Sequence, residues 1–445
     1  MRHLRTSTVL LALLASWPAH ASEGPAKVAL KAARLIDVKG ERVLSPAVVL
    51  IEDGRIVQVG SNLAVPAGTR VIDLGQATLL PGLIDAHVHL TGVPENSGYK
   101  ELGVSLARET LYGASNALKT LLAGFTAARN VGAGGYSDVA LREAIDAGDL
   151  PGPRLLVSGP PLGITGGHCD ENLLPPRFHY REEGVADGPW EARTKAREVI
   201  KYGADLIKVC ASGGVLSKGD QPGAPQYSLE ELRAIVEEAH RLGRKVAAHA
   251  HGTQSIKEAI RAGVDSIEHA SLIDAEGLSL AKEHGTFLVM DIYNDDFILE
   301  EGLKMGMLPE SLQKEKAIGQ LQRDSFSRAV KAGVRMAFGT DAGVYPHGGN
   351  AKQFAVMVRF GMTPMQAIRA ATLDAADLLG WKDKIGSLEP GKLADVIAVQ
   401  GDPLKDIRAL EDVGFVMKNG VVVKDTLKAT AGCGLAITGN AVGGL

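Results

Sequence analysis

The residues of this chain that could do chemistry are histidines, a lysine and an aspartate in or directly after short apolar stretches. The clearest case is the pair His87 and His89, which are separated by one residue. Residues i and i+2 of a strand point to the same face, so these two imidazoles could hold one cation together. A single inward histidine is more often a hydrogen-bonded core residue, and the metal hypothesis therefore depends on the whole set. The candidate ligands are His87, His89, Lys208, His249, His269 and Asp341.

Lys208 is unusual because it lies within the apolar run Ala204–Ala211. Burial in such a run disfavours the charged ammonium and lowers the pKa of the lysine. A neutral amine can add carbon dioxide and become a carbamate, an anion whose two oxygens suit a bridge between two cations. The alternative is an ion pair between Lys208 and a carboxylate such as Asp341. Cys210 faces the same way as Lys208 and is interpreted as a core residue.

The elements that must position these residues alternate between apolar strands and amphipathic helices. The stretch Leu229–Leu242 has the helical spacing of apolar residues, with Ser228 as its expected N-cap. Eight strand–helix units in one run predict an α/β fold, a (β/α)8 TIM barrel, in which chemistry takes place at the C-terminal ends of the strands. The predicted strands are Leu83–Leu90, Phe125–Val131, Arg154–Ser158, Asp205–Ala211, Lys245–His251, Ser266–Ala270, Thr286–Tyr293 and Arg335–Thr340.

Two hairpin signals lie outside this run, one near each end of the chain. The segment Ala47–Gly60 turns at Asp53 and the segment Val416–Lys424 turns at Asn419, each followed by a glycine. We expect the two ends to pair into one small β-sandwich beside the barrel. The predicted boundaries are residues 22–80 and 388–428 for the sandwich and residues 81–387 for the barrel.

The first residues are typical of an export signal. Two arginines precede the apolar run Val9–Ala15, and residues 19–21 have the small–x–small pattern of a cleavage site. The run is much shorter than the ~20 residues that span a bilayer, which argues against a membrane anchor. We expect residues 1–21 to be removed, the mature chain to begin at Ser22, and the protein to be periplasmic or secreted. Residues 429–445 are expected to form a flexible tail.

Composition excludes several classes of protein. Lys plus Arg is 48 and Asp plus Glu is 52, so the net charge of −4 leaves no basic surplus for the phosphates of a nucleic acid. Hydrophobic residues make up 45% of the chain, which excludes a disordered protein, and three cysteines cannot build a disulfide framework. We expect a small-molecule partner, with no nucleic acid and, after signal cleavage, no membrane.

The candidate ligands are similar to the binuclear metal set of the amidohydrolase superfamily. The segment Val71–Asp85, which leads to the first histidine pair, and the segment Ser387–Val396 resemble the same family. The resemblance is strongest to the branch of Xaa-Pro dipeptidase-like and imidazolonepropionase-like proteins. That branch includes zinc carboxypeptidases that cleave dipeptides and enzymes that hydrolyse the amide of ochratoxin A. The segments that resemble this branch are Val246–Gly252, Asp265–His269 and Gly339–Gly343.

By this resemblance the site holds two divalent metals. Nitrogen and oxygen ligands suit zinc, and manganese or cobalt stays an alternative. Asp341 would also carry a proton from the attacking water to the leaving amine. The resemblance assigns His87, His89 and Asp341 to the more buried metal, His249 and His269 to the second, and carbamylated Lys208 to the bridge.

Five further residues are candidates for substrate contacts. His251 could donate to the scissile carbonyl or merely support a ligand, and Tyr293 could hydrogen-bond an oxyanion or simply pack. His168 lies in a glycine-rich segment that permits close substrate approach, or that makes an ordinary turn. His347 and Asn350 follow the last predicted strand and could bind a substrate carboxylate.

The resulting expectation is a metal-dependent hydrolase that releases a C-terminal amino acid from a dipeptide or an N-acyl amino acid. Ochratoxin A, an N-acylated phenylalanine, is one candidate substrate. An alternative is a cyclic-amide hydrolase of the imidazolonepropionase or dihydroorotase type. A metal-binding scaffold without activity would predict loss of Lys208 or Asp341, and both are present. The resemblance also implies a homo-oligomer, with an octamer as the expected state.

Overall fold

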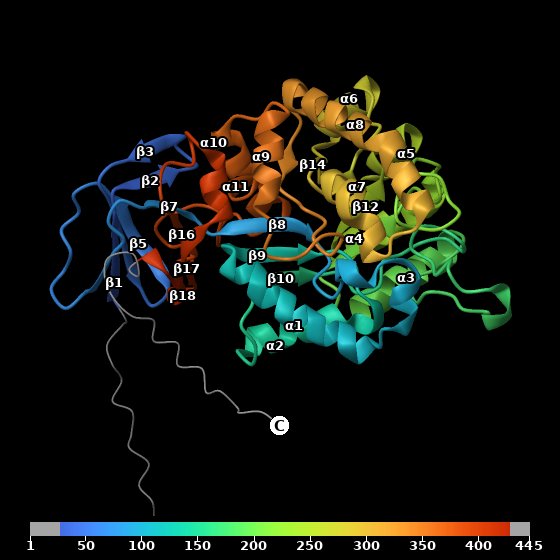
Figure 1. Cartoon of the computed structure of the whole chain (residues 1–445), viewed down its shortest axis with the longest axis horizontal. Helices are drawn as coiled ribbons and strands as arrows, with labels where there is room; N and C mark the ends of the chain where they lie inside the picture. Colours follow the sequence, from blue (N-terminus) through green and yellow to red (C-terminus); the bar gives the residue numbers. More distant parts are fainter. Residues whose placement is uncertain (1–26, 428–445) are drawn as a thin grey trace, which may run out of the picture.

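The computed structural model describes residues 27–427. The predicted export signal and the predicted tail therefore lie outside the described residues. Figure 1 shows a β-rich part made from both ends of the chain beside a larger part in which helices surround parallel strands. Within the described residues, no helix has both the length and the apolar content that a membrane crossing requires.

Eight parallel strands form the interior of the larger part. They make a three-stranded sheet in the order β10-β9-β8 and a five-stranded sheet in the order β11-β12-β13-β14-β15. Single parallel bridges, Leu162 to Val209 and Val88 to Ala342, lie where the two sheets adjoin. Each strand falls within one predicted stretch, and closure into one continuous barrel stays a prediction. The strands are β8 (Leu83–Val88), β9 (Phe125–Asn130), β10 (Arg154–Val157), β11 (Leu206–Cys210), β12 (Lys245–Ala250), β13 (Ser266–His269), β14 (Phe287–Val289) and β15 (Met336–Ala337).

Helices cover the outer faces of these strands, which explains why the strands are almost entirely buried. The α-helices are α1 (Leu106–Leu122), α2 (Ser137–Ala147), α3 (Pro189–Lys201), α4 (Leu229–Arg241), α5 (Thr253–Ala262), α6 (Ala275–His284), α7 (Asn294–Met305), α8 (Pro309–Ala332), α9 (Lys352–Arg359), α10 (Pro364–Ala370) and α11 (Leu373–Leu378). The short 3-10 helices are η1 (Pro94–Asn96), η2 (Gly98–Gly103), η3 (Gly134–Tyr136), η4 (Pro176–Phe178) and η5 (Ile407–Glu411).

The start of α4 shows how local sequence fixes a boundary. The Ser228 hydroxyl accepts from the backbone N–H of Glu231, and the Glu231 carboxylate accepts from the backbone N–H of Ser228. This capping box satisfies two N–H groups that the first turn leaves without helical partners. The predicted helix and its N-cap are confirmed, and Leu242 is the C-cap residue.

Strands from both chain ends share two sheets beside the parallel strands. One has the order β5-β4-β1-β6 and the other β18-β17-β16-β7-β2-β3. Side chains of both sheets, among them Leu30, Val49 and Phe415, form one apolar core. Both predicted hairpins, β4–β5 and β17–β18, are present. The strands are β1 (Lys27–Ala32), β2 (Arg34–Asp37), β3 (Arg42–Leu44), β4 (Ala47–Glu52), β5 (Arg55–Gly60), β6 (Arg70–Asp73), β7 (Thr78–Pro81), β16 (Val396–Val399), β17 (Val413–Lys418) and β18 (Val421–Asp425).

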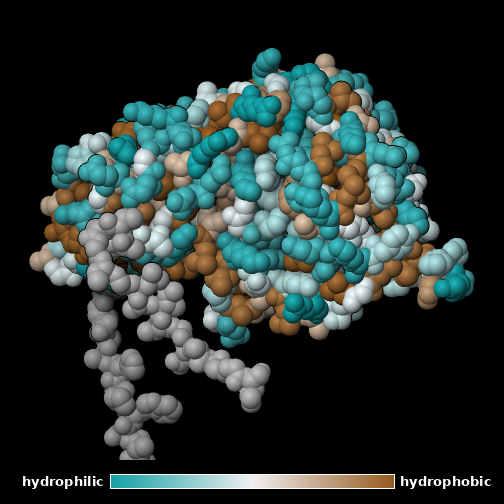
Figure 2. Space-filling model, viewed as in Figure 1, coloured by the Kyte–Doolittle hydropathy of each residue, from teal (hydrophilic) through white to brown (hydrophobic). Residues whose placement is uncertain are grey.

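The surface seen in Figure 2 is largely hydrophilic, with hydrophobic side chains in scattered groups between the charged ones. Scattered exposed apolar residues are normal on a folded protein and mark no site by themselves. The chemistry therefore has to be sought in the interior, where the parallel strands end.

Candidate active site

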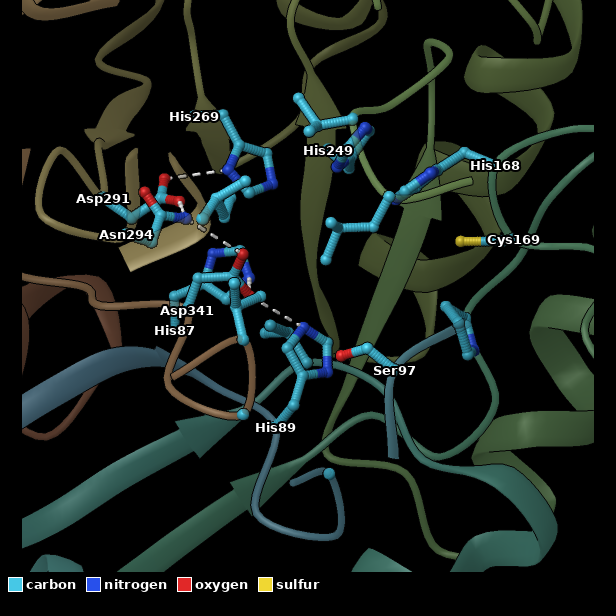
Figure 3. Close-up of a pocket in the computed structure, with 18 of the residues that line it drawn as sticks. His87, His89, Ser97, His168, Cys169, His249, His269, Asp291, Asn294 and Asp341 are labelled. Carbon is cyan, nitrogen blue, oxygen red and sulfur yellow. Dashed lines mark hydrogen bonds and ion pairs between the residues drawn. The ribbon is translucent and has the colours of Figure 1, made fainter. Parts of the chain in front are cut away.

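A cavity of about 390 Å³ lies where the parallel strands end, and all six predicted metal ligands line it. Figure 3 shows the labelled histidines and Asp341 around this space. The strands are parallel, so their carboxyl ends meet at one edge and bring side chains from distant sequence positions together. The lining includes His87, His89, Lys208, His249, His269 and Asp341, together with His168 and His251.

The first ligand group is formed by His87, His89 and Asp341. The Asp341 Oδ1 lies 3.2 Å from the His87 Nε2 and 3.3 Å from the His89 Nε2. The His87 ring is fully buried, and neither of its nitrogens has a hydrogen-bond partner among the described residues. An orphaned buried nitrogen beside a carboxylate and a second imidazole fits the donor set of a divalent cation.

A second group of potential ligand atoms comes from His249, His251 and His269, which lie within 4.8 Å of one another. A third group combines His269, Asp291 and Asp341. His269 and Asp341 each belong to two groups, so the three groups form one connected cluster. The residues present therefore fit more than one divalent metal.

Two members of this cluster have left-handed backbone conformations. The φ of His269 is 69° and the φ of Asp341 is 55°. Non-glycine residues adopt this region at a cost of ~1–3 kcal/mol, and such positions concentrate at functional sites. His269 is the last residue of β13 and Asp341 lies four residues beyond β15, so both left-handed turns fall where the chain leaves the parallel strands at the cavity.

Outer partners fix the orientation of most histidine rings. Each partner takes the Nδ1 of the ring, which turns the Nε2 toward the centre, as is usual for metal-binding histidines. His249 is the exception, because its Nε2 lies 3.4 Å from the Gly213 carbonyl and leaves the Nδ1 free. For His87 the group beside Nδ1 is a Glu268 oxygen at ion-pair distance. The hydrogen-bond partners of Nδ1 are the Gly132 carbonyl for His89, Ser217 for His168, Ser271 for His251 and Asp291 for His269.

A buried ion pair supports the His87 ring. Arg129 is 3% exposed and donates to Glu268 across 2.8 Å, while the other Glu268 oxygen lies 3.0 Å from the His87 Nδ1. Burial alone would raise the pKa of Glu268, but the Arg129 guanidinium beside it holds that pKa well below its usual range. Glu268 is therefore an anionic carboxylate at ion-pair distance from the His87 Nδ1.

Lys208 is buried as the sequence predicts, with 4% exposure. Burial lowers its pKa, against the opposing effect of Glu268 and Asp341. The alternative of an ion pair with Asp341 is not seen, since the ion pairs of Asp341 in the described chain are with His87 and His89. A lysine with a lowered pKa is the form of the side chain that a carbamate requires.

His251 lies in the cavity, but its hydrogen bonds do not suit the predicted donation to a carbonyl. Ser271 donates its hydroxyl proton to the Gln322 Oε1 across 2.7 Å, so it must accept from the His251 Nδ1. Burial lowers the pKa of His251 and keeps the ring neutral. The neutral ring then offers an acceptor Nε2 to the cavity.

Three predicted substrate contacts do not line the cavity. Tyr293 precedes α7 and packs edge-on against Tyr345, with ring centroids 5.0 Å apart. The His347 Nε2 donates to the His89 carbonyl across 3.1 Å, and Asn350 donates to Asp85 across 2.8 Å. The prediction that His347 and Asn350 bind a substrate carboxylate is therefore wrong, because both side chains turn back onto the segment that carries the first histidine pair.

A disulfide joins Cys169 and Cys210 at the wall of the cavity. Cys210 ends β11, and Cys169 follows His168 in the segment after β10. The interpretation of Cys210 as an ordinary core residue is corrected, because the side chain is buried but covalently bound. Spacing alone did not indicate this bond.

Sequence reasoning missed Arg129, Glu268, Asp291 and Asn294. Asp291 lies two residues beyond β14 and 2.8 Å from the His269 Nδ1, and Asn294 donates to Asp291 across 2.6 Å. The signal that could have found Arg129 and Asp291 was a charged residue inside an apolar run, the reasoning applied to Lys208. Glu268 lies within the segment Asp265–His269 that resembles the family, but no spacing pattern assigns it a role of its own.

The rest of the cavity is acidic. Lys208 is the one lysine or arginine in its lining, which also contains Glu101, Glu109, Asp295 and Glu315. Burial raises the pKa of Glu101 to about 7, and burial also raises the pKa of Glu315 to about 7. Partial neutralisation of these carboxyl groups lets a cavity with a single lysine accommodate them.

Comparisons with known proteins agree with this geometry. The amidohydrolase family matches residues 78–423. Ochratoxinase from Aspergillus niger is 37% identical over 434 residues, covering 91% of this chain and 88% of that protein. A solved Xaa-Pro dipeptidase with methionine bound in its active site is 38% identical, with a TM-score of 0.81, covering 89% of this chain and 100% of that one. The solved Aspergillus niger ochratoxinase is 34% identical, with a TM-score of 0.81, covering 91% and 96%.

Proposed function

This chain belongs to the amidohydrolase family and is a hydrolase acting on amide bonds, and from that premise we propose that it releases the C-terminal amino acid from a dipeptide or an N-acyl amino acid. The observation that carries the proposal is the meeting of six predicted ligands in one cavity of about 390 Å³. The similarity to an ochratoxinase and to a dipeptidase with bound methionine supports an amino acid as the leaving group. Ochratoxin A, which would give ochratoxin alpha and phenylalanine, is a candidate substrate.

The fold and setting that go with this function are also proposals. We propose that the two parallel sheets close into one (β/α)8 barrel, since bridges lie at both of their junctions. The export signal read from residues 1–21 supports a periplasmic or secreted enzyme. The family resemblance supports a homo-oligomer that acts on small molecules.

The metal site would hold two divalent ions, with zinc as the proposed identity. When bound, such ions supply Lewis acids that polarise a carbonyl and lower the pKa of water. The first ion would be held by His87, His89 and Asp341, the second by His249 and His269, and a carbamate on Lys208 would bridge them.

The protein's own groups have separate tasks around these ions. Asp341 accepts the proton of the attacking water at a carboxylate oxygen and delivers it to the nitrogen of the leaving amine. The Nδ1 partners of the histidines, above all Glu268 and Asp291, hold the rings in orientation before substrate arrives. His168 and His251 line the same cavity beside the ligand His249, where they would contact the substrate.

The test is a screen of dipeptides, N-acyl amino acids, hydantoins and imidazolone with purified zinc-loaded enzyme, with metal content measured on the same sample. We expect about two metals per chain and turnover of the linear amides. Lys208→Ala should lose most of the metal and the activity. Turnover confined to cyclic amides would replace this proposal by the imidazolonepropionase or dihydroorotase type.

A second comparison tests the leaving group. An N-acyl amino acid should be hydrolysed at least ten-fold more efficiently, in kcat/KM, than its C-terminal amide, a difference of ~1.4 kcal/mol. Equal rates would identify a general amidase instead of a carboxypeptidase-like enzyme. His347→Ala should leave this ratio unchanged, because His347 does not line the cavity.

A further inference from the structure

His168 is held from behind by a chain of polar side chains that leads away from the cavity. The ring lines the cavity and stacks on His249, with centroids 4.1 Å apart and planes inclined by 17°. Figure 3 shows the two rings on the same wall. On its far side the His168 Nδ1 lies 2.8 Å from the Ser217 Oγ.

Ser217 in turn contacts a buried ion pair. Its hydroxyl donates to the Asp220 Oδ1 across 2.7 Å, and Lys314 of α8 donates to the same oxygen across 2.8 Å. The Lys314 and Asp220 side chains are only 9% and 10% exposed. Lys314 also donates to the carbonyls of Ser217 and Gly214, so its ammonium has three acceptors.

The charges of Asp220 and Lys314 set the direction of the hydrogen bonds that connect His168, Ser217, Asp220 and Lys314. Asp220 carries a negative charge and accepts from both Lys314 and Ser217. The Ser217 hydroxyl has one proton, which goes to Asp220, so its oxygen must accept from the His168 Nδ1. The ring therefore keeps its proton on Nδ1 and turns an acceptor Nε2 toward the cavity.

The segment that carries Ser217 has no helix or strand of its own between β11 and α4. Its shape therefore depends on these contacts and on close packing under the ring. A Cβ placed on Gly214 would lie 2.3 Å from the His168 ring, so a larger residue at that position would displace the ring. The His168 backbone N–H is held as well, since it donates to the Gln226 Oε1 across 2.9 Å.

We propose that Ser217, Asp220 and Lys314 are positioning residues that set the orientation and tautomer of His168 and, through it, the affinity for substrate. The proposal rests on the proposed function only in that His168 is taken to contact the substrate amide. A contact of this kind acts on the ground state and the transition state alike, so its loss raises KM more than it lowers kcat.

The kinetic test uses the zinc-loaded enzyme and whichever linear amide it hydrolyses best. Ser217→Ala and Lys314→Met should each raise KM about five- to ten-fold with kcat changed less than about two-fold. Ser217→Thr should restore KM to within about two-fold, because it returns the hydroxyl. Lys316→Met, a matched change at an exposed position of the same helix, should change neither constant. Equal KM values for Ser217→Ala and the wild type would overturn the proposal.

A double-mutant cycle separates action through His168 from a general effect on the loop. In a His168→Ala background, the further change Ser217→Ala should alter kcat/KM by less than about two-fold, because the ring it positions is absent. Effects that multiply would show that Ser217 acts independently of His168 and would overturn the proposal. Metal content and the unfolding temperature, measured for each variant, identify any loss of fold.

A measurement without turnover keeps this test distinct from the proposed function. In protein labelled at the histidine Cε1, the His168 signal is identified by its disappearance in His168→Ala. We expect this signal to shift in Ser217→Ala and in Asp220→Asn but not in Lys316→Met. An unmoved signal would refute the positioning role even if no amide substrate were found, whereas a shifted signal without any turnover would refute only the proposed function.

Discussion

In the proposed mechanism, Asp341 is both the proton carrier and a ligand of the first metal. Asp341→Asn keeps the size of the side chain, and asparagine tolerates the left-handed φ of 55° at this position. We expect kcat to fall by ~10²-fold or more, because the amide cannot accept the proton of the attacking water. The measurement is steady-state kinetics with metal content determined on the same sample. A variant with full metal content and full turnover would show that another group carries the proton.

Glu268 is expected to control metal affinity without touching the metal. Glu268→Gln keeps an oxygen for Arg129 but removes the negative charge that lies 3.0 Å from the His87 Nδ1. Loss of such an outer partner typically weakens metal binding by ~10–100-fold. Competition with a chromophoric chelator measures the metal affinity directly, and Glu283→Gln, on the exposed surface of α6, serves as the control. Unchanged affinity would limit Glu268 to a role in packing.

At the scale of elements, α3 and α4 are joined by the carboxylate of Glu238. Hydrogen bonds from Arg197 and Arg241 lower the pKa of Glu238 to about 2, against the effect of burial. A group whose pKa is lowered by folding stabilises the protein above its unfolded pKa and loses that contribution as the pH falls. Glu238→Gln should therefore lower the unfolding temperature by ~2 °C at pH 7, a small effect because both arginines are more than half exposed.

Measuring the unfolding temperature as a function of pH distinguishes a loss of charge at Glu238 from a loss of packing. The difference between Glu238→Gln and the wild type should shrink as the pH is lowered from about 4.5 toward 2, the interval between the two pKa values. Thermal unfolding at several pH values measures it. A difference that is constant with pH would assign the effect to packing of α3 against α4.

At the scale of the whole molecule, the two predicted hairpin turns meet although they come from opposite ends of the chain. A Cβ on Gly420 would lie 2.6 Å from the Gly54 Cα, and both glycines have positive φ, 77° and 73°. Gly420→Ala should therefore destabilise the fold by backbone strain and by a steric clash between the turns. Gly401 has a φ of 79° with open space around its Cβ position, so Gly401→Ala measures the strain alone, ~1–2 kcal/mol.

Chemical denaturation of both alanine variants tests the contact. We expect the free energy of unfolding to fall further for Gly420→Ala than for Gly401→Ala, with the excess reporting the clash. Equal losses would mean that the turns separate at little cost, and the contact between the chain ends would then contribute nothing to stability.

The sequence by itself determined the strands, the hairpin turns, the α4 cap and the six candidate ligands. The physical reason is that these features follow from local rules. Apolar runs bounded by turn residues mark strands, Ser228 with Glu231 satisfies free N–H groups at a helix start, and parallel strands bring their ends to one edge. Lys208 was recognisable because a lysine in an apolar run is costly unless its charge is altered or paired.

Only the tertiary structure decided which side chains meet across long sequence separations. The packing of whole segments brings these partners together. Arg129 forms an ion pair with Glu268, Cys169 a disulfide with Cys210, and His347 a hydrogen bond with the His89 carbonyl. Nearness to Asp341 in sequence suggested that His347 and Asn350 face the substrate. Side-chain directions in an irregular segment follow no period, however, so spacing carries no information about them. The chain from His168 to Lys314 likewise exists only because α8 packs beside the loop that follows β11, a juxtaposition that no local pattern encodes.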